Sequence, residues 1–547
     1  MKQRKILEAI VVGSSGALSA FSEVDAMWWD LDSLRSVAVV QGELVTPSSQ
    51  PEEGVVLWLG TEAAHAWGPD WRFSLCYVVV PWNMEVLGVR CFEGCHFLTA
   101  VVFEWGSAPR VIAERAFADS GLQSFTIFAS VGVLGNECFA DCQSLACAVF
   151  EVGFPLRTIG KGVFARSGLQ AFTIPAGVEV LAAGCFDSCQ SLTSIVFEQG
   201  SKLLAVEERA FADTGLRSFT IFASIEVLGK ECFAGCQSLA CAVFEVGSPI
   251  QTIGEGVFAG SGLQAFTIPA GVEVLAAGCF DGCQSLTSIV FEQGSKLRVI
   301  EERAFADTGL LFFHVFASVR VLGNACFADC QSLAYVTFEV GSPLQTIGEG
   351  VFARSGLQAF TIPAGVEKIG EGCFAYCQSL SSVAFEGGSH LQTIGEGVFA
   401  GSGLQAFTIP AGVKVLSANC FAGCQLLTAL AFEPGSQLRA IGKAAFIDCA
   451  NLPSICIPAG VEKIGEGCFA YCQSLSSVAF EAGSHLQTIG ECTFLASSIC
   501  SIGIPASVEE IGECCFLDCQ SLGSVTCNSS RFIVVRRGCG WEVYKRE

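Results

Sequence analysis

Residues 362–396 read IPAGVEKIGEGCFAYCQSLSSVAFEGGSHLQTIGE, and residues 457–491 repeat this stretch with a single change, Gly387 to Ala482. Near-identity over 35 residues indicates a recent tandem duplication within one gene. The chain is therefore built from repeats, and its fold follows from the structure of one repeating unit.

The elementary unit is shorter than the duplicated stretch and is marked by one phenylalanine. Successive markers are separated alternately by 25 and 22 residues, with a single step of 23 between Phe446 and Phe469. Two kinds of unit therefore alternate, and one pair spans 47 residues. The markers are Phe92, Phe117, Phe139, Phe164, Phe186, Phe211, Phe233, Phe258, Phe280, Phe305, Phe327, Phe352, Phe374, Phe399, Phe421, Phe446, Phe469, Phe494 and Phe516.

Each unit contains a short run with apolar residues at its first, fourth and sixth positions, as in 380–385 (LSSVAF) and 404–409 (LQAFTI). The alternation over the last three positions is typical of a half-buried strand. About twenty such strands are expected, the first at Leu75–Val80 and the last at Leu522–Cys527. One strand plus one return path makes a coil, which must stack on neighbours to bury its apolar side. The sequence therefore predicts an α/β-type repeat solenoid, a horseshoe or arc with a concave parallel β-sheet.

The segment IPAGVEKIGEGCFAYCQSL at 362–380 carries a family resemblance. It resembles the BspA-type leucine-rich repeat, whose units run roughly I-P-x-x-V-x-x-I-G-x-x-A-F-x-x-C-x-x-L. The match recurs in nearly every unit over 75–527 and departs at Cys373, where the family usually has Ala. One small residue replaces another there, so the resemblance implies a leucine-rich-repeat fold. It also implies a function in adhesion, because members are often surface-exposed proteins of bacteria and protist parasites.

The ends of the chain differ from the repeats. Residues 1–20 have the basic start and small-residue end of a secretory signal, although Glu8 interrupts the apolar part, so a cleaved signal and a retained segment both remain open. Residues 21–74 are expected to form an amino-terminal cap with degenerate repeats. The solenoid is expected over 75–527, and residues 528–547 are expected to be a carboxyl-terminal cap or tail.

Charge and hydropathy narrow the class of partner. A net charge of −23 argues against nucleic acid, because phosphate binding needs clustered Lys and Arg. No uninterrupted apolar stretch of the length of a membrane span occurs, so no transmembrane span is expected. An acidic column follows alternate strands and is interpreted as a solvated edge: Glu104, Glu151, Glu198, Glu245, Glu292, Glu339, Glu386, Glu433 and Glu481.

The 30 cysteines indicate buried thiols more than disulfides or metal sites. Twenty form ten C-F-x-x-C pairs in alternate coils, which leaves same-column cysteines roughly 10 Å apart, beyond the span of a disulfide. We interpret the pairs as an interior ladder that bonds to turn backbones. Cys449 breaks the alternation and is expected beside Cys424 or Cys472. Disulfides are more plausible near the carboxyl end, among Cys492, Cys500, Cys514, Cys527 and Cys539.

The sequence offers little for catalysis. It has five histidines, and none lies in a zinc-protease motif; no nucleophile elbow, phosphate-binding loop or dinucleotide fingerprint occurs in a matching context. The prediction is therefore that the protein is not an enzyme and has no catalytic, cofactor-binding or metal-binding residues.

One place on the predicted concave face stands out. Residues 310–315 read LLFFHV where the repeats usually have LQAFTI, and Tyr335 occupies a position that is usually Ser or Ala. Phe312, His314 and Tyr335 should then lie side by side on a face that otherwise carries small residues. Clustered aromatics predict a contact patch; neutral drift in one repeat copy is the alternative interpretation.

These observations favour a non-catalytic protein-binding or adhesion solenoid, cell-surface or secreted, whose partner is a protein or cell-surface ligand. An intracellular leucine-rich-repeat scaffold or regulatory protein in the cytoplasm is the alternative. Self-association is a third interpretation, because a long smooth sheet could pack on a copy of itself.

Overall fold

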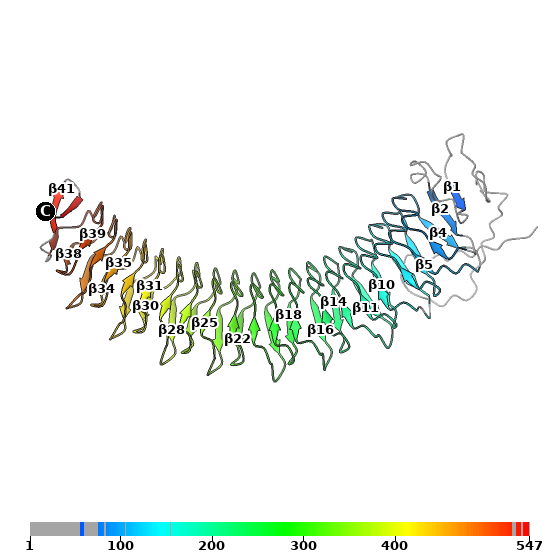
Figure 1. The fold of residues 1–547 in the computed structure, drawn as a ribbon, viewed down its shortest axis with the longest axis horizontal. Helices are drawn as coiled ribbons and strands as arrows, with labels where there is room; N and C mark the ends of the chain where they lie inside the picture. Colours follow the sequence, from blue (N-terminus) through cyan, green and yellow to red (C-terminus); the bar gives the residue numbers. More distant parts are fainter. Residues whose placement is uncertain are drawn as a thin grey trace, which may run out of the picture. The chain divides into compact units, whose positions relative to one another are not determined.

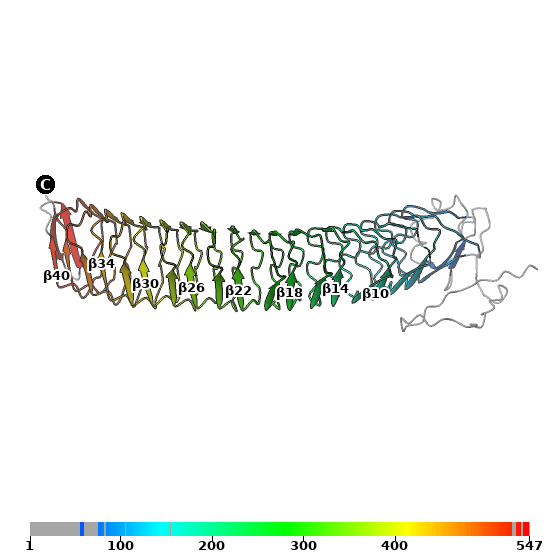
Figure 2. The same ribbon diagram turned by 90° about the horizontal axis from the view of Figure 1, so that it is seen from below.

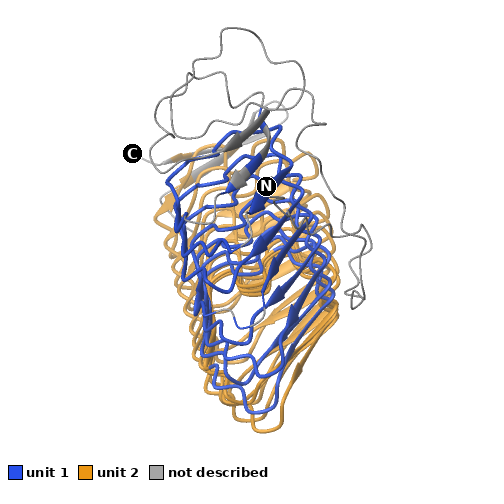
Figure 3. Ribbon diagram, turned by 90° about the vertical axis from the view of Figure 1, so that its right-hand side faces the viewer, with its two compact units in different colours: residues 1–250, 260–263 blue, residues 251–259, 264–547 orange. Residues whose placement is uncertain are grey.

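The computed structural model describes residues 55–58, 75–80, 84–103, 106–151, 153, 155–527, 532–537 and 540–545. The chain forms two compact units: unit 1 comprises residues 1–250 and 260–263, and unit 2 comprises residues 251–259 and 264–547 (Figure 3). The expected signal segment at 1–20 lies outside the described residues. So does the expected cap at 21–74, apart from β1 (Val55–Trp58), which pairs with β2 (Leu75–Val80).

Each coil of the solenoid contributes one longer and one shorter strand (Figure 1). The strand expected at Leu75–Val80 is β2. In unit 1 it is followed by seven four-residue strands: β4 (Ala100–Phe103), β6 (Ser124–Ile127), β8 (Cys147–Phe150), β10 (Ala171–Ile174), β12 (Ser194–Phe197), β14 (Ser218–Ile221) and β16 (Cys241–Phe244). The two-residue strands between them are β3 (Val86–Leu87), β5 (Val111–Ile112), β7 (Val133–Leu134), β9 (Thr158–Ile159), β11 (Val180–Leu181), β13 (Ala205–Val206) and β15 (Val227–Leu228).

Unit 2 continues the same alternation. Its four-residue strands are β18 (Ala265–Ile268), β20 (Ser288–Phe291), β22 (Phe312–Val315), β24 (Tyr335–Phe338), β26 (Ala359–Ile362), β28 (Ser382–Phe385), β30 (Ala406–Ile409), β32 (Ala429–Phe432), β34 (Ser454–Ile457), β36 (Ser477–Phe480), β38 (Ser501–Ile504) and β40 (Ser524–Cys527). Its two-residue strands are β17 (Thr252–Ile253), β19 (Val274–Leu275), β21 (Val299–Ile300), β23 (Val321–Leu322), β25 (Thr346–Ile347), β27 (Lys368–Ile369), β29 (Thr393–Ile394), β31 (Val415–Leu416), β33 (Ala440–Ile441), β35 (Lys463–Ile464), β37 (Thr488–Ile489) and β39 (Glu510–Ile511). An antiparallel hairpin, β41 (Phe532–Arg537) and β42 (Gly540–Lys545), follows β40.

The α/β label is wrong, because every regular element in the described residues is a strand. The return path around each marker Phe consists of turns, with backbone φ positive at two positions four residues apart, such as Arg209 (52°) and Asp213 (54°). A residue with positive φ ends a right-handed helix. The turn amides bond across coils instead: the N–H of Phe211 donates to the carbonyl of Cys232 over 2.9 Å. No helix in the described part of the chain is long and apolar enough to cross a membrane.

The strands of both kinds are parallel, but they pair differently. In unit 2 the two-residue strands β25 to β39 form one eight-stranded sheet, whereas most four-residue strands bond only in pairs, such as β26 with β28. Figure 2 shows the four-residue strands as a row of separate arrows.

The pairing of the strands tests the expectation that about twenty strands form one concave sheet. Strands in an unbroken sheet lie about 4.8 Å apart, so the coils of unit 2 are closest along the two-residue strands. Most four-residue strands of unit 2 hydrogen-bond only in pairs, and only β34, β36, β38 and β40 form a longer sheet among the described residues. The expectation of one concave sheet of about twenty strands is therefore wrong for unit 2, because two-residue strands that the sequence pattern did not reveal carry the continuous hydrogen bonding.

The core is a column of stacked phenylalanine rings. The marker rings lie nearly parallel from coil to coil; Phe374 and Phe399, for example, have centroids 5.5 Å apart and an interplanar angle of 9°. The inward phenylalanines of alternate strands pack against them, as Phe407 does on Phe399 at 5.0 Å. One residue type at one position in each coil thus fills the interior, which explains why the Phe spacing marks the coils.

Candidate functional site

The four-residue strands have one exposed side, here called the long-strand face. On β26, Phe360 and Ile362 are buried whereas Ala359 and Thr361 are exposed, and the same alternation recurs along both units. The outward residues are mostly Ser, Ala and Thr, as the sequence pattern predicted. Such small side chains leave a smooth surface with little to anchor a partner.

The three predicted patch residues come together on this face of unit 2. Parallel pairing of β22 with β24 sets Phe312 beside Tyr335 and His314 beside Thr337. Phe312 is 59% exposed and Tyr335 is 51% exposed, and the neighbouring Leu311 is 52% exposed. We call Leu311, Phe312, His314 and Tyr335 the β22–β24 patch.

Hydrogen bonds hold the polar members of the β22–β24 patch. His314 Nδ1 lies 2.9 Å from the Thr337 hydroxyl, and its ring meets Phe316 edge-on with centroids 5.1 Å apart. The Tyr335 hydroxyl donates to Gln358 Oε1 over 2.6 Å. Side chains fixed in this way lose less conformational entropy when they bind.

The equivalent coils earlier in the chain supply a natural comparison. Ninety-four residues upstream, 216–221 read LRSFTI where 310–315 read LLFFHV. Ser218 therefore corresponds to Phe312 and Thr220 to His314, and Cys241 corresponds to Tyr335. The same backbone carries small side chains at these positions, so the β22–β24 patch is not required by the fold.

The acidic column has a structural role that the sequence interpretation as a solvated edge missed. Each carboxylate accepts a hydrogen bond from a backbone amide in the turn one coil earlier, over 2.8–3.0 Å. The amides belong to Ala129, Ala176, Ala223, Ala270, Ala317, Ala364, Ala411 and Ala459, and the acceptors are Glu151, Glu198, Glu245, Glu292, Glu339, Glu386, Glu433 and Glu481. Glu104 lies outside the described residues.

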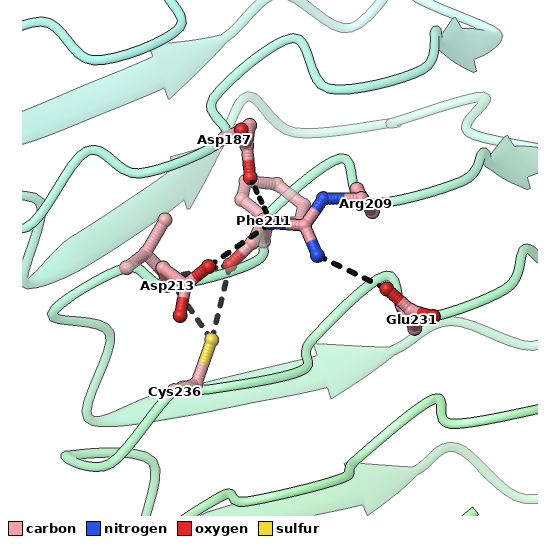
Figure 4. Close-up of polar contacts among 7 residues, drawn as sticks. Asp187, Arg209, Phe211, Asp213, Glu231 and Cys236 are labelled. Carbon is pink, nitrogen blue, oxygen red and sulfur yellow. Dashed lines mark hydrogen bonds and ion pairs between the residues drawn. The ribbon is translucent and has the colours of Figure 1, made fainter.

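An arginine clamp was also missed by the sequence analysis (Figure 4). Arg209 bonds to Asp187 at 2.8 Å, to Asp213 at 3.0 Å and to Glu231 at 3.0 Å, which joins three successive coils. Its guanidinium is thus surrounded by carboxylates of its own chain. The recurring segment 207–213, EERAFAD, was the available signal, because it places Arg and Asp on the two positive-φ positions.

The second cysteine of the C-F-x-x-C pairs forms the predicted interior ladder. Cys236 Sγ donates to the carbonyl of Phe211 over 3.0 Å and lies 3.2 Å from the Thr214 hydroxyl (Figure 4). Nine other thiols make the same bond one coil back over 2.9–3.2 Å: Cys142, Cys189, Cys283, Cys330, Cys377, Cys424, Cys449, Cys472 and Cys519.

This geometry suppresses the reactivity of the ladder. Burial raises the pKa of the Cys236 thiol to about 11, so it stays protonated and is a poor nucleophile. Cys449, which breaks the alternation in the sequence, continues the ladder through Phe421. Within the residues that the structure describes, no group of three His, Cys, Asp or Glu side chains is arranged to hold a metal ion.

Comparison with known proteins identifies the repeat. A family model described as "BspA type Leucine rich repeat region (6 copies)" matches residues 71–193, 110–240, 204–334, 298–428 and 439–536. A search of curated protein sequences gave no match.

The solved structures that match the chain share low sequence identity with it. A leucine-rich repeat protein from Bacteroides ovatus is 20% identical, with 83% of this chain and 82% of that chain covered and a TM-score of 0.41. The pneumococcal vaccine antigen PcpA is 20% identical, with 63% and 84% covered and a TM-score of 0.39. A leucine-rich cell surface protein from Faecalibacterium prausnitzii is 21% identical, with 66% and 88% covered and a TM-score of 0.35.

Proposed function

Because the chain belongs to the BspA-type leucine-rich repeat family, we propose that it is a non-catalytic binding protein that acts in adhesion, at the cell surface or after secretion. Its ligand is a protein or another molecule on a cell surface. The β22–β24 patch is the contact site, and Phe312, His314 and Tyr335 are its anchors.

The exposure of Phe312 beside Tyr335 is the observation that carries this proposal. Exposed aromatics cost solubility and are not needed by the coil, since Ser218 and Cys241 occupy the equivalent positions. Aromatic side chains dominate the binding energy of protein interfaces because they bury a large area with few rotatable bonds. A rigid aromatic cluster on a smooth face therefore fits a binding site.

The recurring polar residues support a non-catalytic role. The glutamate column accepts backbone hydrogen bonds, and Arg209 is held by three carboxylates. The ladder thiols are buried with raised pKa, as at Cys236. These groups are engaged in holding one coil to the next.

A photo-crosslinking experiment tests the contact site. The photoreactive residue p-benzoylphenylalanine replaces Phe312 in the full chain, and in a matched control it replaces Ser218, the equivalent position on β14. Each protein is irradiated with biotinylated surface proteins from cells that the source organism contacts. We expect a covalent adduct from position 312 and none from position 218. The same adducts from both positions would contradict the proposal, and an adduct only with a second copy of the chain would indicate self-association.

Reversion of the patch measures its share of the affinity. The triple variant Phe312→Ser, His314→Thr and Tyr335→Ser gives β22 and β24 the side chains of ordinary coils. We expect the partner's Kd to rise roughly 30-fold or more, the effect of losing at least one interface hot spot. The control variant, Ala359→Ser with Thr361→Ser on β26, should leave the Kd unchanged. Unchanged binding by the triple variant would remove the patch from the proposal.

Surface display requires its own measurement. Protease treatment of intact cells of the source organism should digest the protein, while a cytoplasmic marker stays whole. Protection of the chain until the cells are lysed would instead favour the intracellular scaffold.

A further inference from the structure

Two cysteines outside the thiol ladder lie together in the last coils of unit 2. Strand β37 pairs with β39 so that Thr488 lies beside Glu510 and Ile489 beside Ile511, which means that paired residues are 22 positions apart. The same offset relates Cys492 to Cys514. The N–H of Cys492 donates to the carbonyl of Glu513 over 2.9 Å, which continues this register through the turn. Both cysteines occupy the first positive-φ position of their coils, at 50° and 53°.

The two cysteines occupy equivalent positions of adjacent coils, and reagents can reach both. Cys514 is exposed and Cys492 is half-buried. Neighbouring strands are about 4.8 Å apart, which falls inside the Cα separation that a disulfide spans. Among the other exposed cysteines, Cys456 pairs in register with Ala479 and Cys241 with Ser218, so neither faces a thiol on its paired strand.

The geometry points to a disulfide between Cys492 and Cys514 that staples the final coils of the solenoid and forms under oxidising conditions. The oxidant is a small disulfide such as oxidised glutathione. One cysteine, as its thiolate, attacks a sulfur of the oxidant, forms a mixed disulfide and releases one glutathione thiolate. The second cysteine then attacks the protein-bound sulfur and releases the second glutathione. The protein loses two hydrogens and the oxidant becomes two molecules of reduced glutathione.

The position of the pair explains what the staple does. β39 is the last strand of its eight-stranded sheet, with no further two-residue strand hydrogen-bonded beyond it in the described residues. Ile511 on β39 is consequently less buried than its neighbour Ile489 on β37. Terminal repeats have one packing neighbour fewer and open more readily than internal ones. A bond from Cys514 to Cys492 ties the coil that ends this eight-stranded sheet to the coil before it.

The buried thiol of Cys515 should not compete with Cys514 for the oxidant. Cys515 adjoins Cys514 in sequence but points inward, and burial holds its pKa far above the ordinary range of a thiol. Oxidation should therefore select the exposed partner of this adjacent pair.

Peptide mapping of the full chain tests the inference. The reduced protein is exposed to mixtures of oxidised and reduced glutathione, quenched with an alkylating agent and digested without reduction. We expect one linked peptide pair joining Cys492 to Cys514, while Cys456 and Cys241 carry single glutathiones. Separate glutathiones on Cys492 and Cys514, or a bond from either to Cys500, would overturn the assignment.

A proteolysis measurement tests the staple independently. Oxidation should slow cleavage of the carboxyl-terminal coils severalfold in the parent chain and leave the Cys492→Ser and Cys514→Ser variants unaffected. Cys514 is exposed, Cys492 is only half-buried and serine is close in size to cysteine, so the serine variants should keep the fold and the parent cleavage pattern under reducing conditions. Equal slowing in the parent chain and in both variants would mean that another group responds to the oxidant, and the assignment would fail.

Discussion

Cys142 donates its thiol hydrogen to the carbonyl oxygen of Phe117, 3.0 Å away and one coil earlier in the stack. The same thiol lies 3.4 Å from the Ser120 hydroxyl. The bond joins the second position of a C-F-x-x-C pair to the backbone of the preceding marker Phe. It recurs along both units, so these cysteines serve as hydrogen-bonding spacers between coils.

Stability should fall in alkaline solution because of this ladder. Burial raises the pKa of Cys142, Cys330 and Cys424 to about 11, whereas an unfolded thiol titrates near its ordinary value. Between these values the unfolded chain releases protons that the folded chain retains. The stabilisation is therefore complete below about pH 8.5 and is lost as the pH rises towards 11, by up to about 1.4 kcal/mol per pH unit for each thiol.

The urea midpoint, measured with a reducing agent at about pH 8, 9 and 10, checks this expectation. A variant with Cys142→Val and Cys330→Val supplies the control, since it removes two titrating thiols and should show a shallower decline. A decline of equal slope in both proteins would assign the effect to other groups.

The glutamate column should stabilise turns rather than bind cations. Glu292→Ala removes the acceptor of the Ala270 amide, 3.0 Å away, and should lower the free energy of unfolding by about 0.5–1.5 kcal/mol. Glu292→Gln keeps an acceptor oxygen and should cost less. Hydrogen exchange at Ala270 should accelerate in the alanine variant.

The exposed Glu371 provides the matched control for this test. If Glu371→Ala destabilises as much as Glu292→Ala, the loss comes from general charge and not from the turn bond.

Much of this fold was predictable because one residue type repeats at one position in every coil. The Phe spacing located the coils, and the alternation of apolar residues located β2 and the outward Ser, Ala and Thr of later strands. The two-residue strands were not predictable, since a pair such as Thr346–Ile347 is too short to show alternation. Because the two-residue strands were not expected, the continuous sheet was predicted along the four-residue strands, whereas in unit 2 it runs along the two-residue strands β25 to β39.

The candidate site was predictable in position but not in detail. Phe312 and Tyr335 occupy equivalent positions of neighbouring coils, so the repeat alone sets them side by side. The bonds from Tyr335 to Gln358 and between His314 and Thr337 depend on side-chain rotamers, which the repeat does not specify. The roles of Arg209 and Glu292 depend on partners in neighbouring coils and were missed for the same reason.

At backbone positions with positive φ, replacing glycine by alanine should lower the free energy of unfolding, and replacing alanine by glycine should raise it. Gly350 has a φ of 57°, and an added Cβ would meet only the Cβ of Ala353, 3.9 Å away. Gly350→Ala should therefore cost about 1–2 kcal/mol from backbone strain alone. Ala325 already occupies the equivalent position of the preceding coil with a φ of 53°. Ala325→Gly should relieve its strain and raise the free energy of unfolding by up to about 1 kcal/mol. Urea midpoints of the two variants check the signs, and a loss of stability in both would contradict the strain argument.

Substitutions of the two adjacent phenylalanines on β22 should have different effects: one should lower stability, and the other should weaken partner binding. Phe313 is 3% exposed, with ring centroids 5.2 Å from Phe305 and 4.8 Å from Phe327. Phe313→Ala should therefore cost about 3–5 kcal/mol, because it empties a site in the stacked core. Phe312→Ser removes an exposed ring that the equivalent coil replaces with Ser218, so the free energy of unfolding should change by less than about 0.5 kcal/mol. Denaturation and partner binding measured on the same preparations decide the outcome. If Phe312→Ser unfolds the protein as readily as Phe313→Ala, the exposed aromatics belong to the fold and a binding role loses its physical basis.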